Sequence, residues 1–182
     1  MSNPFVTKNI LKWYDLNKRS LPWRKNVSKE KRQYNTLISE FMLQQTQVAT
    51  VIPYFNKFVK EIPNIKKLAS VDNKKLIKLW EGLGYYSRSR NLKKAAQSII
   101  KNFNGVIPDN FEDLKSLSGI GDYTANAILA IAFNKPYIPL DGNVERIIKR
   151  YLYLKKENEI HKENLIEKKS ILGFSNRSSD YA

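Results

Sequence analysis

Leu117-Ser-Gly-Ile-Gly-Asp-Tyr-Thr-Ala125 is the stretch of sequence that decides how this chain folds. Two glycines, Gly119 and Gly121, flank Ile120, and the stretch lies between two segments with helical hydrophobic spacing. Glycine adopts positive φ easily and lets a partner approach the backbone closely, so the pattern predicts a tight hairpin between two helices. We expect Ile120 to anchor that hairpin to the core.

The hairpin also predicts a site for an anion. The chain re-enters a helix directly after Gly121, and the first N–H groups of a helix have no partners inside it. Such groups commonly bind phosphate. A plain helix corner with a glycine cap has the same pattern, so both interpretations stay open on the motif alone.

The composition favours a polyanionic partner. The 182 residues include 32 lysines and arginines against 17 aspartates and glutamates, which gives a formal net charge of +15 at pH 7. A field of this sign attracts nucleic acids, although an A+T-rich coding sequence would also enrich a chain in lysine. No apolar run approaches the roughly 20 residues of a membrane-spanning helix, and no signal peptide is evident. We therefore expect a soluble intracellular protein with one domain or two lobes.

Two residue types with distinctive chemistry are scarce. Cysteine is absent, and the one histidine, His161, lies in a charged stretch where we expect it on the surface. Disulfides, thiolate metal sites, histidine metal centres and Ser/His triads are therefore not expected within this chain.

Hydrophobic spacing predicts an all-α fold without strands. Helices are expected over about residues 4–17, 33–47, 51–58, 64–69, 73–83, 92–103, 111–117, 124–133 and from 144 onward, with a weak helical period over 164–172. Residues 25–32 are expected to form a charged loop. The segment 124–133 is small and apolar, which predicts a buried helix.

Two segments carry candidate binding chemistry. One stripe of the 33–47 helix contains Glu40 as its single carboxylate and no lysine, so we expect it to face a ligand, with an ordinary solvated face as the alternative. Tyr85 and Tyr86 lie close to Arg88, and aromatic side chains beside arginines can stack on bases or wedge between them. One of these two tyrosines is expected in the core. Asp141 directly precedes a helix, where its ordinary role is an N-cap.

These residues together resemble the helix-hairpin-helix DNA glycosylase superfamily. The order of glycine hairpin, buried helix, proline-containing link and Asp141 is similar to that superfamily, and longer stretches resemble its A/G-mismatch-specific adenine glycosylase branch. Those stretches are 21–24, 39–48, 51–55, 80–86, 90–92 and 140–144. The resemblance implies two helical lobes that flank a DNA-binding cleft. One would be a six-helix lobe over 27–137, and the other would combine 1–26 with 138–182.

The resemblance also implies a reaction, the removal of adenine mispaired with 8-oxoguanine or guanine after the nucleotide is flipped out of the duplex. Glu40 would protonate N7 of adenine, and Asp141 would stabilise the oxocarbenium-like sugar. Tyr123 and Asn143 would lie beside these two acids. The other implied site residues form two sets: Trp23, Arg24, Leu43 and Val48 line the adenine pocket, and Gln44, Gln45, Tyr85, Arg88, Gly119, Ile120 and Gly121 contact DNA.

The resemblance further implies a monofunctional glycosylase that acts as a monomer on double-stranded DNA. It would be cytoplasmic and nucleoid-associated in a bacterium, without a membrane partner. Two other functions stay open. One is a pyrimidine-lesion glycosylase with lyase activity, whose nucleophile is a lysine where this chain has Tyr123. The other is a helix-hairpin-helix module that binds DNA without catalysis.

The sequence departs from the family pattern in two ways. Members usually bind a [4Fe–4S] cluster through four cysteines that lie beyond the point where this sequence stops. They also carry a separate C-terminal domain that recognises 8-oxoguanine. Neither is present, so we expect the chain to be a C-terminally truncated fragment, with an unusually reduced protein as the alternative. Residues 26–32 form an insertion to which no function is assigned.

Overall fold

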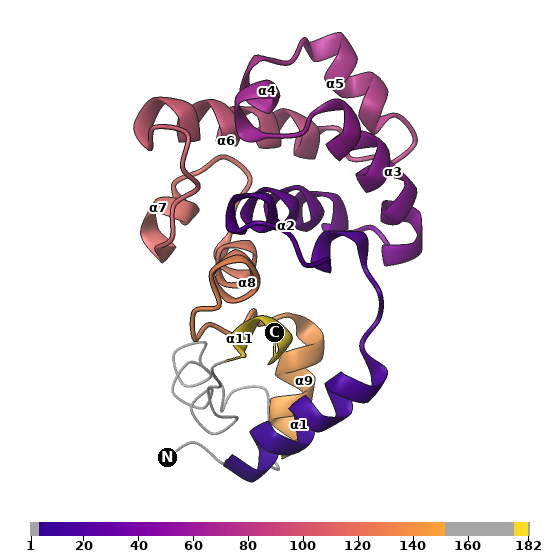
Figure 1. The fold of residues 1–182 in the computed structure, drawn as a ribbon, viewed down its shortest axis with the longest axis vertical. Coiled ribbons are helices and arrows are strands. Elements are labelled where there is room, and N and C mark those ends of the chain that lie inside the picture. Colours follow the sequence, from indigo (N-terminus) through magenta and orange to yellow (C-terminus); the bar gives the residue numbers. More distant parts are fainter. Residues whose placement is uncertain (1–3, 152–176, 182) are drawn as a thin grey trace.

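The computed structural model describes residues 4–151 and 177–181. Within these ranges the chain forms ten α-helices and one 3-10 helix and no strand, which confirms the all-α class (Figure 1). The elements are α1 (Pro4–Asn17), η1 (Pro22–Arg24), α2 (Lys29–Leu43), α3 (Val48–Glu61), α4 (Ile65–Ser70), α5 (Asn73–Trp80), α6 (Ser87–Asn102), α7 (Phe111–Lys115), α8 (Asp122–Phe133), α9 (Gly142–Tyr151) and α11 (Ser178–Tyr181). The predicted helical period over 164–172 and His161 lie outside the described residues.

Helix α2 is the centre of the fold. It packs against α3 and α6 on one side and against α8 on the other (Figure 1). Ten consecutive residues of α2, Gln33 to Met42, are buried, and they include polar residues such as Asn35, Thr36 and Glu40. Of the stripe that carries Glu40, Thr36 and Glu40 are buried, whereas Leu43 and Gln44 are half-buried and Gln47 is exposed. The solvated-face alternative therefore does not hold for Thr36 and Glu40.

Two ends of α2 differ from the prediction for local reasons. The helix begins at Lys29 because the Ser28 hydroxyl caps it, accepting a hydrogen bond from the backbone N of Lys31 at 3.3 Å. Only the first half of the expected 25–32 loop is thus non-helical. The helix ends at Leu43 because Gln45 adopts a left-handed conformation with a φ of 58°, which turns the chain into α3.

Most of the remaining helices form two groups, one on each side of the packed pair α2 and α8. Figure 1 shows α3, α4, α5 and α6 on one side of α2, whereas α1, α9 and α11 lie together beyond α8. The range 27–137 contains seven helices, α2 to α8, one more than expected, and its division from the rest of the chain as a lobe stays a prediction. Among the described helices, none has the length and apolar character needed to span a bilayer.

The glycine hairpin joins α7 to α8, and its two glycines have different roles. Gly119 has a φ of 82°, and a Cβ built there would lie 2.8 Å from Cβ of Asn91 and 2.9 Å from Cε1 of Phe41. Ile120 is buried in the core, as predicted. Gly121 is extended, with φ −96° and ψ −178°, and a Cβ there would meet nothing within 4 Å. The expectation of positive φ therefore holds for Gly119 and is wrong for Gly121.

Candidate active site

A cavity of about 740 Å³ contains most of the predicted site residues. It is lined by Glu40, Leu43, Gln44, Gln45, Tyr85, Ser87, Arg88, Tyr123, Leu140 and Asp141. These residues come from the end of α2, the α5–α6 connection, the start of α8 and the approach to α9. Sequence reasoning did not select Ser87 and Leu140, although Ser87 precedes Arg88 and Leu140 begins the 140–144 stretch that carries the family resemblance.

Glu40 lies on the buried helix α2 and is 8% exposed. Burial raises its pKa from 4.5 to about 7, because a carboxylate is poorly stabilised away from water, while the positive charge of Arg24 acts in the opposite direction. A carboxyl group with this pKa holds its proton in about half of the molecules at neutral pH. Glu40 can therefore act as a proton donor into the cavity.

Asp141 is held in one orientation at the start of α9. Its Oδ1 accepts hydrogen bonds from the backbone N of Asn143 (2.9 Å) and of Val144 (2.8 Å), and its Oδ2 accepts one from Nδ2 of Asn143 (3.0 Å). Arg146 donates in turn to Oδ1 of Asn143. Asp141 is thus an N-cap, and it also lines the cavity. The capping contacts fix the carboxylate without removing it from the site.

Tyr123 lies at the start of α8 and is 43% exposed. Partial burial and the nearby charges of Glu40 and Asp141 raise its pKa to about 12. The phenol is therefore protonated at neutral pH and can donate a hydrogen bond toward either acid. Tyr123 thus lines the same cavity as Glu40 and Asp141.

Trp23 and Arg24 adjoin the site but do not line the larger cavity. Both line a second cavity of about 170 Å³. Trp23 also packs edge-on against Phe55 in the core, with ring centroids 5.3 Å apart. Val48 packs against the core and lines neither of these two cavities. Of the four residues expected in the adenine pocket, only Leu43 therefore lines the cavity that contains Glu40.

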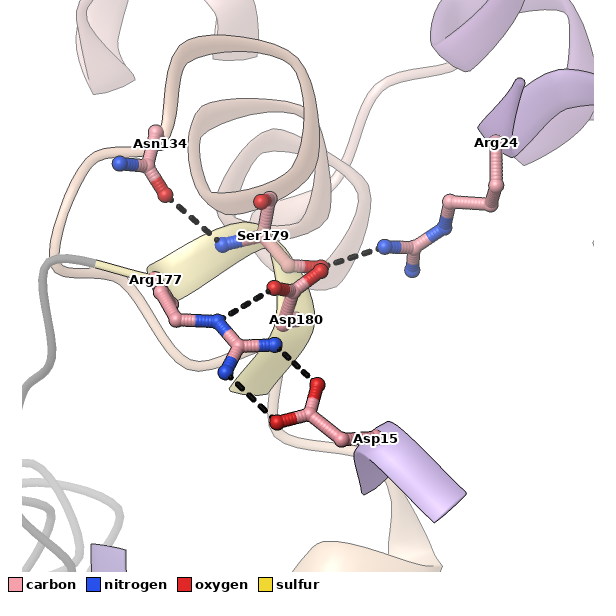
Figure 2. A network of polar contacts seen from close by, with 6 residues as sticks. All are labelled: Asp15, Arg24, Asn134, Arg177, Ser179 and Asp180. Atoms are coloured by element: carbon pink, nitrogen blue, oxygen red, sulfur yellow. Dashed lines mark hydrogen bonds and ion pairs between the residues drawn. The ribbon is translucent and has the colours of Figure 1, made fainter. Parts of the chain in front are cut away.

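The C-terminal helix α11 holds Arg24 in place. The Arg24 guanidinium donates to the carbonyl oxygen of Ser179, whose backbone N donates to Oδ1 of Asn134 at 3.0 Å (Figure 2). Arg177 anchors the same turn through its guanidinium group. Nη2 and Nη1 donate to Oδ1 and Oδ2 of Asp15 in α1, at 2.5 and 3.0 Å, and Nε donates to Oδ2 of Asp180 at 2.8 Å. Helices α1 and α8 are thus tied to an arginine that acts on Glu40. These contacts join distant parts of the sequence, and no local motif predicts them.

Two expectations near the α5–α6 connection need correction. Tyr85 is 61% exposed and Tyr86 is 36% exposed, so neither belongs to the core. Arg88 is 6% exposed, and its guanidinium donates to backbone carbonyl oxygens. The expected direct contact of Arg88 with DNA does not fit this burial.

Gln44 connects α2 to the hairpin. Its Nε2 donates to the carbonyl oxygen of Gly119 at 3.3 Å and to Oγ1 of Thr124 at 3.4 Å. The N-terminus of α8 has no side-chain cap, because Gly121 occupies the N-cap position. The structure thus places an uncapped helix N-terminus beside open space at Gly121.

The chain offers no ligands for an iron–sulfur cluster. Such clusters are bound mainly by cysteine thiolates, and none of the 182 residues is cysteine. Within residues 4–151 and 177–181, no group of three or more histidine, aspartate or glutamate side chains could hold a metal ion. A cluster therefore does not fit the residues of this chain.

A family model described as "HhH-GPD superfamily base excision DNA repair protein" matches residues 38–170, a range that contains Glu40, the hairpin and Asp141. This chain belongs to the HhH-GPD superfamily. An adenine DNA glycosylase of Buchnera aphidicola subsp. Baizongia pistaciae is 44% identical over 153 residues, covering 84% of this chain and 42% of that protein. The Homo sapiens adenine DNA glycosylase is 44% identical over 147 residues, covering 78% of this chain and 27% of that protein. The HhH-GPD chain thus spans less than half the length of these curated relatives.

Solved structures have the same fold at lower identity. A thermostable thymine-DNA glycosylase superposes with a TM-score of 0.81 at 23% identity, covering 97% of this HhH-GPD chain and 82% of that one. A non-covalent endonuclease III–DNA complex superposes with a TM-score of 0.74 at 20% identity, covering 98% of this chain and 79% of that one. At such identities the likeness establishes the helical architecture alone.

Proposed function

We propose that this HhH-GPD chain carries the catalytic site of an adenine DNA glycosylase. Such an enzyme hydrolyses the N-glycosidic bond of adenine mispaired with 8-oxoguanine or guanine. One observation carries the proposal: Glu40, a buried acid with a raised pKa, and Asp141, a fixed carboxylate, line the same cavity. The relatives at 44% identity, which are named adenine DNA glycosylases, support adenine as the base.

The two acids divide the reaction between them. Glu40 donates its proton to N7 of adenine, so that the C1′–N9 bond breaks with its electrons moving into a neutral base. Positive charge then develops on the sugar, and the nearby Asp141 carboxylate stabilises it. Water adds at C1′ and gives up a proton to the Glu40 carboxylate, which leaves an abasic site. Protonation before bond cleavage requires an acid that still holds a proton at neutral pH, as Glu40 does.

The surrounding residues position these groups and the DNA. Asn143 fixes the Asp141 carboxylate through its side-chain amide, and Tyr123 offers a phenolic hydrogen to the acids. Gln45 and Tyr85, which are exposed beside the cavity, enter the base stack around the mispair. The uncapped N-terminus of α8 binds a backbone phosphate, a contact that positions DNA without reading its sequence. The partner is double-stranded DNA, and the enzyme acts as a monomer.

Single-turnover release of adenine from a duplex with adenine opposite 8-oxoguanine tests the proposal. The Glu40→Gln substitution should slow release by about 10²-fold or more, because the amide cannot supply the proton. Glu61→Gln is the matched control, since Glu61 forms an exposed ion pair with Lys75 far from the cavity. Release by Glu40→Gln near the wild-type rate would refute the assignment. Binding by the wild type without base release would instead indicate a non-catalytic module.

A further inference from the structure

Arg88 is a buried arginine that the proposed chemistry does not use. It lies in the first turn of α6. Its Nη1 donates to the carbonyl oxygens of Phe41 (3.3 Å), Met42 (2.8 Å) and Gln44, and its Nη2 donates to those of Leu83 (3.1 Å) and Gly84 (3.2 Å). One guanidinium group therefore joins the end of α2 to the α5–α6 turn, residues 81–86.

The carbonyl groups that Arg88 binds need a donor from outside their own helices. The last four carbonyl groups of an α-helix have no partner within it, and Phe41 and Met42 belong to the last turn of α2. Leu83 and Gly84 lie beyond the end of α5, in the α5–α6 turn, so their carbonyl groups are not part of a helix. A positive charge at a helix C-terminus is also electrostatically favourable. The planar guanidinium, with several donors in fixed directions, meets both sets of carbonyl groups at once.

Each of the two connected turns holds a non-glycine residue in a left-handed conformation. Gln45, in the α2–α3 turn (residues 44–47), has a φ of 58°, and Tyr85 has a φ of 46°. This conformation is strained for residues with a Cβ and persists where surrounding contacts fix it. Arg88 binds the carbonyl groups of Gln44 and Gly84, the residues that directly precede the two strained ones. It thus supplies a fixing contact at each turn.

We propose that Arg88 is a positioning residue that sets the spacing of the two turns and thereby the orientation of Gln45 and Tyr85 toward DNA. Both side chains are exposed and line the cavity that contains Glu40. The inference rests on the proposed glycosylase function, because it assigns the two turns to opening the duplex where a nucleotide leaves the helix. Arg88 acts through these turns and does not touch the reacting atoms.

The aromatic residues around the guanidinium strengthen the connection. The Arg88 guanidinium carbon lies 5.6 Å from the ring centroid of Trp80 and 5.5 Å from that of Tyr85. Trp80 also donates from Nε1 to the carbonyl oxygen of Gly84 at 3.1 Å. Lysine would keep the positive charge, but it lacks the planar fork that reaches both turns. Arg88→Lys therefore removes the geometry and leaves the charge.

Duplex opening can be measured without catalysis by placing 2-aminopurine beside the mispair, since its fluorescence rises when it unstacks. We expect saturating wild-type protein to raise the fluorescence and Arg88→Lys to lose most of that increase. Arg90→Lys makes the same change at an exposed position on α6 and should keep the increase. Equal fluorescence with wild type and Arg88→Lys would overturn the inference, whether or not the wild type releases adenine.

Excision rates provide the second measurement. On a paired duplex, Arg88→Lys should slow single-turnover release by about 10- to 100-fold, the scale that a misplaced positioning group produces. On a duplex with the target adenine opposite an abasic site, where little opening is needed, release should stay near the wild-type rate. Equal loss on both substrates would overturn the positioning role. If Arg88→Lys does not fold, Trp80→Phe replaces it, because this variant removes the hydrogen bond to Gly84. It should slow release on the paired duplex and leave release opposite an abasic site near the wild-type rate. The same rate change on both substrates would overturn the inference.

Discussion

Glu40 shows how one buried side chain couples stability to activity. Its pKa is about 7 in the folded protein against 4.5 ordinarily, so the folded state binds the proton more tightly than the unfolded state. The free energy of unfolding should therefore fall as pH rises from about 4.5 to 7, by roughly 3 kcal/mol in total. Glu40→Gln removes this loss and should make the protein more stable than wild type at pH 8, with little difference near pH 4. Urea unfolding at the two pH values measures it.

The same titration predicts the pH dependence of the proposed reaction. The single-turnover rate should decline as pH rises through about 7, because the fraction of protonated Glu40 declines. If the single-turnover rate increased above pH 7 while the free energy of unfolding fell, the ionisation of Glu40 would affect stability but not the reaction. That result would contradict Glu40 as the acid.

Tyr123 decides whether the reaction stops at base removal. A lyase needs an unprotonated amine near C1′ of the sugar, and among residues 4–151 and 177–181 no lysine lines the cavity that contains Glu40. The nearest lysines in sequence each form an ion pair: Nζ of Lys115 lies 3.0 Å from Oδ1 of Asp122, which raises the pKa of Lys115, and Nζ of Lys135 lies 3.0 Å from Oδ2 of Asp109. We therefore expect no trapped protein–DNA imine when borohydride is present during turnover.

A Tyr123→Lys variant supplies the positive control for that experiment. It places an amine at the start of α8 beside both acids and should yield a slowly migrating covalent band. A strong band from the wild type would contradict the monofunctional assignment and favour the glycosylase/lyase alternative.

At the scale of elements, the hairpin predicts opposite outcomes for its two glycines. Gly119→Ala forces a Cβ into contact with Asn91 and Phe41 at positive φ, so it should destabilise the fold by about 2–4 kcal/mol. Gly121→Ala enters open space in an extended conformation and should change stability by less than about 0.5 kcal/mol. If a phosphate occupies that space, Gly121→Ala should weaken DNA binding about tenfold. Unchanged binding would contradict the phosphate site.

Sequence reasoning recovered the elements that local patterns define and missed those that long-range contacts define. The hairpin and the buried helix after it follow from glycine spacing and hydrophobic period, and the burial of Glu40 agrees with the absence of lysine from its stripe. The end of α2 was placed too late because the left-handed turn at Gln45 has no glycine to mark it. The burial of Arg88 against backbone carbonyl groups could not be predicted, because an arginine beside tyrosines has the same pattern whether it faces DNA or buried carbonyl groups.

At the scale of the whole molecule, the packing of α1, α8 and α11 depends on residues far apart in the sequence. Asp15 of α1, Asn134 after α8 and Arg177 beside α11 meet in one network that reaches Arg24 (Figure 2). None of them belongs to a recognisable motif, so the sequence alone did not predict that they are in contact. Through Arg24, this network contributes to the electrostatic environment of Glu40.

The net charge of +15 is a property of the entire chain, and it predicts how binding responds to salt. Lysine and arginine contacts to phosphates release counterions, so about six such contacts would lower affinity roughly 10³-fold between 50 and 200 mM salt. Fluorescence anisotropy across a salt series measures the slope. A fully paired duplex of equal length should give the same slope as the mispaired one, because phosphate contacts carry no sequence information. A flat response would mean that the lysine excess reflects base composition and that binding depends on contacts other than phosphate.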